Sequence, residues 1–410
     1  MTEKEKNWFV FIIGLTAMIK LRILGTFAIA ELIAFVSLFF IPIELYKENP
    51  TVNKLFKFAF LWLVGVIISD FWNDTSLEDA LKGTFNVVFL IALIPFVYWA
   101  LYDKPQRLMY YYAGFALSAL YNFYSQKASD LDFLGFQVWR VYGFYPLAVF
   151  VASYLYYKDR HLLSYICIIG FGVWGLFNMS RNVFLNQTLA VVLLLYTNRF
   201  NSENIYDRIS SYRQNIIQLF IMLIIGFGLI DFTYETLAEN GTLGESVHQK
   251  YIMQKYAKNG LASGRGDALL SIYAISKNPI IGYGSYAKDK TNFINKHIIA
   301  TGGIHTRKNN DFIPCHSYIL GTWVHTGLLG ALFFFFILQY LWHIVKSGLL
   351  LYDSEVVGLY MYLLMVALWD ILFSPFDNRI NLLFFIISLM AFEEKLYFEL
   401  ENKYISYKYE

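Results

Sequence analysis

The chain has 410 residues, of which 57% are hydrophobic and only 16% are charged. A soluble domain is nearer to half apolar and a quarter charged, so this composition predicts a protein that crosses a membrane several times. The formal net charge is +2, and the sequence contains no basic block or low-complexity tract. These features exclude nucleic acid as a partner and favour the lipid bilayer.

Apolar runs of about 17–25 residues recur from one end of the chain to the other. They predict an all-α, polytopic integral membrane protein with about twelve transmembrane helices. Because the runs are spread along the whole sequence, residues 1–410 are expected to form a single integral membrane domain. The predicted spans are 8–20, 23–43, 54–72, 83–102, 107–124, 141–157, 162–178, 181–197, 215–232, 317–345, 355–373 and 380–397.

The distribution of Lys and Arg predicts which side of the membrane each connection faces. If the N-terminus is cytoplasmic, the inner segments and span ends carry roughly twice as many cationic residues as the short outer segments. Both termini are therefore expected in the cytoplasm, and the long polar loop at 233–316, between spans nine and ten, on the outside. The tail Glu393–Glu410 is expected to lie along the inner surface or to extend from the last span.

Cysteine and histidine spacing gives no sign of a metal or cofactor site. Cys167 and Cys315 cannot form a disulfide framework and are expected to be free thiols. His297 and His325 lie near His316 in the sequence, but no histidine pair there has a recognised metal-ligand spacing. We therefore expect neither a metal nor a cofactor.

Arg181 follows Ser180 at the start of the eighth predicted span. On the predicted topology this helix begins at the outer face, and Ser180 is a candidate N-cap. A helix N-terminus combined with a guanidinium forms an anion site that suits phosphate. The alternative is an interfacial arginine whose side chain reaches lipid headgroups.

Arg265 repeats this arrangement inside the long loop. A helix is predicted through DALLSIYAISKN, and it should end at Pro279 and the Gly282–Gly284 turn. Its apolar stripe predicts that the helix lies on the membrane surface or packs on the spans. The alternative for Arg265 is a solvated loop arginine. The stripe consists of Ala268, Leu269, Ile272 and Ile275.

His316 opens the tenth predicted span, again at its outer end. It is a candidate base, and a structural histidine is the alternative. Two arginines nearby would disfavour its protonated form and keep the imidazole basic. Three helix starts, two arginines and one histidine would thus form an outer site for a diphosphate with a base beside it. Such a diphosphate most naturally belongs to a lipid-linked precursor, whose tail stays in the bilayer.

These residues resemble motifs of the bacterial O-antigen ligase and O-antigen polymerase superfamily. The similar pieces are an SR pair at the head of a span, an R…P-x-x-G-x-G segment and an H…G-x-x-G segment, in the family's order and around its long outer loop. The resemblance implies a GT-C-like fold in the bacterial inner membrane. Outside the stretch from Ser180 to Gly330, the chain matches the family only in hydropathy. The matching residues are Ser180, Arg181, Arg265, Pro279, Gly282, Gly284, His316, Gly327 and Gly330.

The resemblance implies a metal-independent, inverting glycosyltransferase that moves a saccharide from undecaprenyl diphosphate to a sugar hydroxyl in the periplasm. Arg181 and Arg265 would bind the diphosphate, and His316 would be the catalytic base. Arg140, which precedes Gly143 and Pro146, resembles a further family arginine that helps to bind phosphate or sugar. The implied partners are the lipid-linked donor, a glycan acceptor (a lipid-linked repeat unit or lipid A–core) and a chain-length regulator.

Two positions depart from the family pattern. Ser317 follows the histidine where Asn is frequent, and His325 stands where an acidic residue is frequent. The second departure and the sizeable outer segment near Asn122–Arg140 slightly favour an O-antigen repeat-unit polymerase. The alternative within the family is an O-antigen ligase, which transfers the glycan to lipid A–core in lipopolysaccharide synthesis.

A polysaccharide-precursor transporter or flippase is the alternative from another functional class. It would favour ionisable residues at mid-span, of which Glu31 is the clearest example. Whether Asp231, Asp370 or Arg379 lines the site is left open by the sequence.

Overall fold

The computed structural model describes residues 1–22, 26–125, 133–178, 180–199, 205–256, 266–300, 312–315, 317–352, 356–374 and 379–409. The fold is mostly helical, with 82% helix and 2% strand, in agreement with the all-α prediction. The elements are α1 (Glu3–Thr16), β1 (Lys20–Arg22), β2 (Thr26–Ala28), α2 (Ile29–Ser37), α3 (Ile43–Glu48), α4 (Pro50–Trp72), α5 (Leu77–Leu101), η1 (Pro105–Arg107), α6 (Leu108–Ser125), α7 (Phe133–Tyr157), α8 (His161–Phe177), α9 (Arg181–Asn198), α10 (Ile205–Gln214), α11 (Ile216–Glu239), α12 (Glu245–Tyr256), α13 (Gly266–Lys277), α14 (Phe293–Ala300), α15 (Tyr318–Ser347), η3 (Leu349–Leu351), α16 (Val357–Phe373) and α17 (Arg379–Tyr409).

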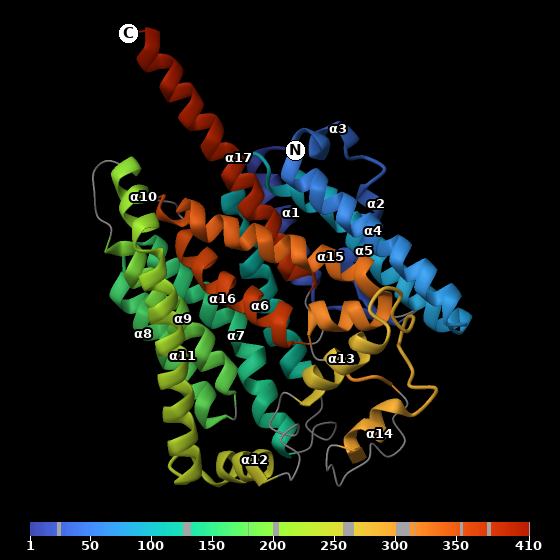
Figure 1. The fold of residues 1–410 in the computed structure, drawn as a ribbon. Coiled ribbons are helices and arrows are strands. Elements are labelled where there is room, and N and C mark those ends of the chain that lie inside the picture. Colours follow the sequence, from blue (N-terminus) through green and yellow to red (C-terminus); the bar gives the residue numbers. More distant parts are fainter. Residues whose placement is uncertain are drawn as a thin grey trace.

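The long helices pack as a bundle in which chain neighbours are mostly neighbours in space. Each of α7, α8 and α9 packs on the helix before it, while α15 packs along α4 and α17 along α5. Both termini lie at one end of the bundle, together with α3 and α10, and α12 and α14 lie at the opposite end (Figure 1). The two termini and the helices α12 and α14 of the long loop thus lie at opposite ends of the bundle. The predicted topology requires this relative placement.

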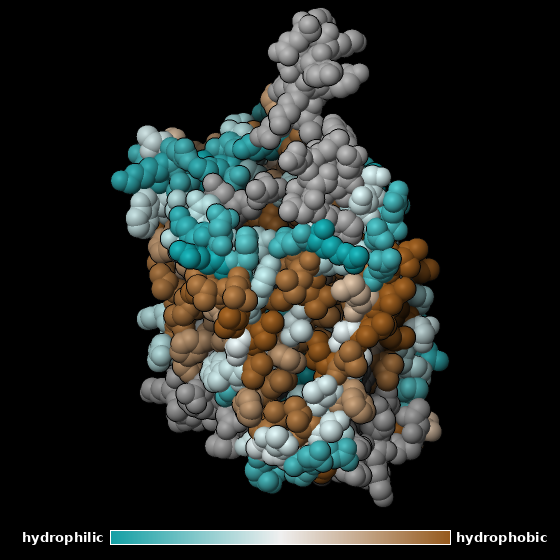
Figure 2. Space-filling model, turned by 90° about the vertical axis from the view of Figure 1, so that its left-hand side faces the viewer, coloured by the Kyte–Doolittle hydropathy of each residue, from teal (hydrophilic) through white to brown (hydrophobic). Residues whose placement is uncertain are grey.

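One face of the bundle has an apolar belt across its middle. Figure 2 shows this brown belt on one face, between polar surfaces above and below it. Within the described part of the chain, four helices are long and apolar enough to cross a membrane: α4, α5, α11 and α15. The helices α8 and α16 are apolar but shorter. These are the features of a membrane protein, although the predicted count of twelve spans is not confirmed.

The predicted second span, 23–43, does not form one helix. Its described part contains β2, the 9-residue helix α2 and a turn that leads to α3. At 1.5 Å per residue α2 is about 14 Å long, roughly half the thickness of a hydrocarbon core. The antiparallel pairing of β1 with β2, from Lys20 opposite Ala28 to Arg22 opposite Thr26, reverses the chain before α2 begins. The N-terminal segment therefore turns back within the bundle.

A buried ion pair explains how α2 keeps a carboxylate inside the protein. Glu31 is 2% exposed and pairs with Arg379 at the start of α17. Its second oxygen accepts the Ala28 N–H at 2.8 Å, which caps the first turn of α2. A buried charge is costly unless it is paired and hydrogen-bonded, and Glu31 has both kinds of partner. Arg379 is therefore neutralised by Glu31.

The predicted tenth span is also interrupted. Gly327, within α15, has φ 65° and ψ −158°, a conformation that is essentially restricted to glycine. The Leu328 N–H then bonds outside the helix, to the Ile280 carbonyl oxygen of the long loop at 3.1 Å. A Cβ built on Gly327 would lie 1.9 Å from that same oxygen. The loop thus occupies the break in α15.

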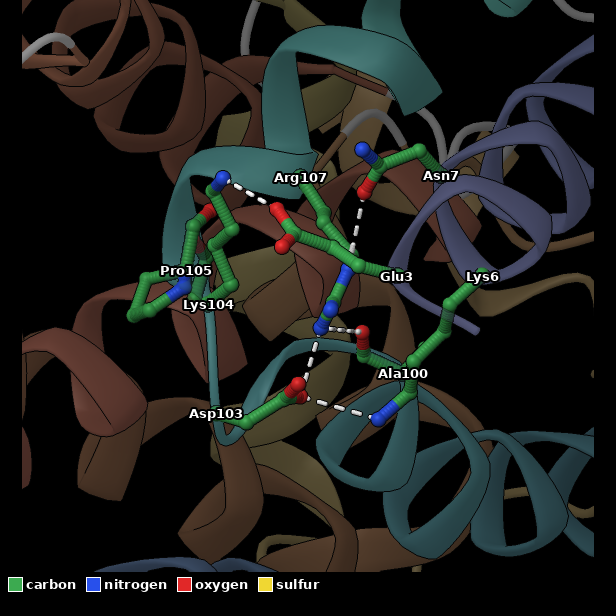
Figure 3. Close-up of polar contacts among 9 residues, drawn as sticks. Glu3, Lys6, Asn7, Ala100, Asp103, Lys104, Pro105 and Arg107 are labelled. Atoms are coloured by element: carbon green, nitrogen blue, oxygen red, sulfur yellow. Dashed lines mark hydrogen bonds and ion pairs between the residues drawn. The ribbon is translucent and has the colours of Figure 1, made fainter. Parts of the chain in front are cut away.

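At the end that carries the termini, a charged network fixes α1 to the α5–α6 connection (Figure 3). The Asp103 carboxylate accepts from Arg107 at 2.5 Å and from Lys6 at 2.9 Å. Arg107 is 2% exposed and also donates from Nε to Asn7 at 3.0 Å. Burial alone would raise the pKa of Asp103, but the hydrogen bonds and charges of Arg107 and Lys6 lower it to about 2.

The C-terminal tail extends from the last span. The helix α17 runs without interruption from Arg379 to Tyr409. Figure 1 shows its C-terminal part projecting away from the bundle. Of the two sequence-based alternatives for Glu393–Glu410, the structure therefore has the extension.

Candidate functional site

Arg181 is the first residue of α9 and is bound by two residues of α11. Its Nη1 lies 2.9 Å from Oδ1 of Asp231, and its guanidinium carbon lies 5.2 Å from the centre of the Tyr234 ring. About a third of each charged side chain is exposed, 32% for Arg181 and 35% for Asp231. The sequence placed both residues at span ends, but only the fold shows that they form a pair. Because the pair is partly open, an external anion can reach the guanidinium.

Ser180 occupies the predicted N-cap position of α9 without acting as a side-chain cap. The residue is 2% exposed, and its Oγ has no hydrogen-bond partner among the described residues. The first N–H groups of any α-helix also lack intrahelical partners. Arg181 thus begins at the positive end of α9, directly after a buried serine, and a helix N-terminus with a guanidinium is the setting of an anion site.

Lys250, on α12, adds a second cation that the sequence analysis missed. The helix α12 packs on the end of α11 through Val247 and Tyr251, which belong to one hydrophobic cluster with Tyr234. Burial lowers the pKa of Lys250, and the nearby charge of Arg181 lowers it further. A bound anion would be attracted by both cations. No local motif marks Lys250; the Val247–Tyr251 spacing could only have suggested the helix.

The start of α9 is also joined to α7. The Asn182 side chain donates to the Tyr142 hydroxyl at 3.0 Å, and one turn deeper Gln187 donates to Tyr145. Arg140 lies on α7, two residues before Tyr142, but its side chain is outside the described part of the structure. The helix that carries Arg140 therefore contacts the helix that begins at Arg181, and the side chain's role stays a prediction.

Arg265 and His316 both lie outside the described residues, so their roles stay predictions, and only their neighbours are described. Ser317 is the N-cap of α15: its Oγ accepts the Leu320 N–H at 3.2 Å and donates to the Ile371 carbonyl of α16 at 2.9 Å. On the other side, the Pro314 carbonyl accepts from Ser271 of α13 at 2.6 Å. Buried hydrogen bonds thus fix the chain just before and just after His316.

The helix α16 connects this region with the Arg181 site. It packs against both α9 and α15, and its residue Ile371 holds Ser317. Asp370, which precedes Ile371, therefore lies on the segment between the two regions. Asp231 thus contacts Arg181 directly, whereas Arg379 is bound to Glu31.

The predicted helix after Arg265 is confirmed as α13, and of its predicted apolar stripe Ile275 is buried in the protein. Leu269 and Ile272 are about half exposed, 49% and 51%, whereas Leu270 and Ala274 are buried and face a small core shared with α14 and α15. Both sets of residues have helical spacing, so periodicity alone could not choose between them. Packing on α15 selects the face that contains Leu270, Ala274 and Ile275.

The P-x-x-G-x-G turn binds to the broken turn of α15. The Tyr283 N–H donates to the Val324 carbonyl at 2.8 Å, and the Gly284 N–H to the His325 carbonyl at 2.9 Å. Gly282 and Gly284 have φ values of +79° and +84°, and a Cβ on Gly282 would lie 2.6 Å from the Gly327 nitrogen. Gly282 and Gly327, one from each motif, are therefore required by one close backbone approach.

No protein-family model matches the chain, and neither a curated protein nor a solved structure matches it significantly. The chemistry of the Arg181 region and the motif residues are therefore the grounds on which a function can be assigned.

Proposed function

We propose that the protein is a membrane-embedded glycosyltransferase that takes its saccharide from a lipid-linked diphosphate. The observation that carries the proposal is the Arg181 region: a partly exposed guanidinium at a helix N-terminus, with a second cation, Lys250, near enough to feel its charge. This donor set suits a diphosphate better than a single headgroup phosphate, because two cationic residues and helix N–H groups can share its oxygens.

A lipid tail has a natural place beside this region. The helix α11, which carries Asp231 and Tyr234, exposes a continuous apolar surface along its length, with Ile224 and Phe232 each 70% exposed. In a bilayer, lipid chains cover such a surface. A diphosphate bound at Arg181 could therefore keep its polyprenyl chain in the membrane next to α11.

In the proposed reaction the acceptor sugar hydroxyl attacks the anomeric carbon from the side opposite the diphosphate. His316 takes the hydroxyl proton, the new glycosidic C–O bond forms, and the bond from the anomeric carbon to the phosphate oxygen breaks. The diphosphate leaves with the electron pair, and Arg181 and Arg265 stabilise its charge. Displacement from the opposite side inverts the anomeric centre. Arg140 is proposed to assist in binding phosphate or sugar.

The proposal includes the bacterial inner membrane, with both termini in the cytoplasm and the long loop in the periplasm. Its support is the excess of Lys and Arg in the segments on the side of the termini. The opposite placement of the termini and of α12 and α14 in the bundle agrees with it. Within the family we favour a repeat-unit polymerase over a ligase, on the sequence departures described above.

Two features that would favour a transporter, a mid-span ionisable residue and a broken helix, are occupied by contacts within the protein. Glu31, the ionisable residue well inside a predicted span, is paired with Arg379. Broken helices often form substrate or ion sites in transporters, but loop backbone occupies the break of α15 at Gly327. A transferase accounts for the exposed cationic site without these features.

The test is single-turnover transfer by the purified protein with an undecaprenyl-diphosphate-linked repeat unit, with and without chelator. His316→Ala should slow transfer by about 10²–10⁴-fold, the usual contribution of a general base, and should leave donor binding intact. His297→Ala is the matched control, because His297 stacks on Tyr273 within the same loop and should leave the rate unchanged. Chain growth with a second lipid-linked repeat unit as acceptor would indicate a polymerase, and transfer only to lipid A–core a ligase.

A wild-type protein that transfers nothing to either acceptor would overturn the proposal. Activity lost to chelator would remove the metal-independent mechanism, and an active His316→Ala would remove His316 as the base.

A further inference from the structure

The end of α4 is bonded to the long loop through buried groups. Oδ1 of Asp70 accepts the Ser285 N–H at 2.5 Å, and Oδ2 accepts the Ser285 hydroxyl at 2.8 Å. Asp70 is 7% exposed and Ser285 is 6% exposed. Both carboxylate oxygens are therefore used by one loop residue, and hydrogen bonds to a charged acceptor are the stronger kind.

The preceding residue of α4 ties the same turn to the break in α15. The Ser69 hydroxyl accepts the Gly284 N–H at 2.9 Å and donates to the His325 carbonyl at 2.8 Å. Ser69 is fully buried. Three segments that are distant in the sequence, the end of α4, the 282–285 turn and the broken turn of α15, thus share one hydrogen-bonded cluster.

The 282–285 turn packs closely against the residues that connect α4 with α5. A Cβ added to Gly284 would lie 2.2 Å from the Thr75 hydroxyl, and one added to Gly83 would lie 1.9 Å from the Ser285 hydroxyl. More peripheral contacts surround this centre: Asn73 donates to the Gly282 carbonyl at 3.1 Å, and Lys288 pairs with Asp79 at 2.8 Å. The segment 282–290 is therefore bound by the α4–α5 turn and the helix residues on either side of it.

The seated turn is connected to the chain around His316. The Tyr283 hydroxyl donates to the Ala274 carbonyl of α13 at 3.0 Å, and α13 in turn holds the Pro314 carbonyl through Ser271. From the other side, Trp323 of α15 donates to the Pro279 carbonyl at 2.7 Å. A displacement of the turn would therefore move α13 and the first part of α15 together.

We propose that Asp70 is a positioning residue for the transfer reaction: by holding Ser285 it fixes the 282–285 turn against α15, and with it the chain on both sides of His316. The inference rests on the proposed function for the meaning of "transfer". The Arg181 region belongs to other helices, α9, α11 and α12. Arg265, however, directly precedes α13, which the turn holds. Loss of Asp70 should therefore impair the chemical step more strongly than donor binding.

The experiment compares full-length wild-type protein, Asp70→Ala and Asp79→Ala, each purified in lipid nanodiscs. Asp79→Ala is the control, because Asp79, in the first turn of α5, also pairs with the loop, but through Lys288, whose side chain is exposed. Amide hydrogen exchange is measured for the segments 280–290 and 318–328. We expect exchange in both segments of Asp70→Ala to be at least about tenfold faster, since local opening becomes easier, and no comparable change in Asp79→Ala. Unchanged exchange in Asp70→Ala would show that Asp70 does not hold the 282–285 turn against α15.

Single-turnover transfer and donor binding are then measured on the same samples. We expect Asp70→Ala to transfer at least about tenfold more slowly, because small misplacements of reacting groups are costly, with a smaller loss of donor affinity. Normal transfer despite faster exchange, or equal losses of binding and transfer, would overturn the positioning role. If Asp70→Ala does not fold, Ser285→Ala removes only the hydroxyl bond and is judged by the same criteria.

The two parts of the experiment separate this inference from the function on which it rests. A wild-type protein without transfer activity would overturn the proposed function and the positioning role with it. The exchange result would still decide whether Asp70 holds the loop.

Discussion

Two regions of the molecule carry the predicted site, and they are built differently. Around Arg181, long charged side chains meet at a partly exposed surface, and α11 contributes almost no buried apolar residues. Around the 282–285 turn, contacts are short, buried and largely between backbone groups. The first region can exchange its partners for a ligand, whereas the second is a fixed frame.

The energies of the two kinds of contact explain this difference. A partly exposed ion pair such as that of Arg181 with Asp231 contributes about 0–1 kcal/mol, so a diphosphate can replace the carboxylate at little cost. A buried donor or acceptor that loses its partner costs about 1–3 kcal/mol, so the frame around Gly327 resists rearrangement. An enzyme that binds a mobile lipid-linked donor and positions a base needs both properties.

The largest expected effect comes from breaking the frame. Gly327→Ala places a Cβ at a left-handed φ of 65° and 1.9 Å from the Ile280 oxygen, so we expect destabilisation of at least about 2 kcal/mol. The matched control is Gly228→Ala in α11, where a Cβ meets nothing within 4 Å. Thermal unfolding in nanodiscs measures both variants. Equal melting temperatures would mean that the frame is not rigid at this point.

The pH dependence of anion binding sharpens the description of the Arg181 region. Burial and Arg181 lower the pKa of Lys250, so its charge should be lost as pH rises through a pKa below that of an ordinary lysine. At pH values below this pKa, inorganic pyrophosphate should therefore bind tightly. At pH values above it, the affinity should be about tenfold lower, because a charge-assisted hydrogen bond is lost. Lys250→Arg should remove the pH dependence, since arginine stays protonated. Titration calorimetry across pH measures this, and an identical profile in both proteins would exclude Lys250 from the site.

The sequence predicted those features of the fold and the candidate site that depend on neighbouring residues in the chain. The Ser180–Arg181 helix start and the Gly282–Gly284 turn were predictable, because each is set by neighbours in the chain. The break in the second predicted span was not, since Glu31 is buried by a partner 348 positions away. The role of Asp70 was likewise not predictable, because its partner Ser285 is 215 positions away.

The face of α13 shows a second limit of sequence reasoning. Two overlapping apolar stripes satisfy the same helical period, and only the surface of α15 decides which one is buried. Similarly, Gly327 was recognised as a motif residue, but its effect, the interruption of α15, requires the Ile280 carbonyl to be in place.

A smaller effect is expected at Asp231, the partner of Arg181. Removing its charge should leave Arg181 more attractive to an anion, so Asp231→Asn should bind pyrophosphate about fivefold more tightly, from about 1 kcal/mol of lost repulsion at a solvated site. Glu235→Gln is the control, because Glu235 is an exposed carboxylate one turn further along α11. Weaker binding by Asp231→Asn would show that Asp231 orients Arg181 rather than competing for it.

The smallest expected effect lies far from the site, in the network at the termini. The pKa of Asp103 is lowered to about 2 from a usual 3.8, so its contribution to stability is present above about pH 4 and is lost as pH falls towards 2. Because the carboxylate is partly exposed, this contribution should be only about 1 kcal/mol. Asp103→Asn should lower stability by this amount at pH 7 and by progressively less below pH 4. A constant difference across that range in acid unfolding would contradict the pairing.

The most direct test of the central claim is donor binding and transfer by Arg181→Lys, compared with Arg199→Lys at the opposite end of the same helix. A lysine keeps the charge but cannot reproduce the bidentate guanidinium fork, so Arg181→Lys should weaken binding of undecaprenyl diphosphate and slow transfer, each by at least about tenfold. Arg199→Lys should match the wild type. Equal donor affinity and transfer in all three proteins, at equal folded amounts, would contradict the assignment of the α9 N-terminus as the diphosphate site.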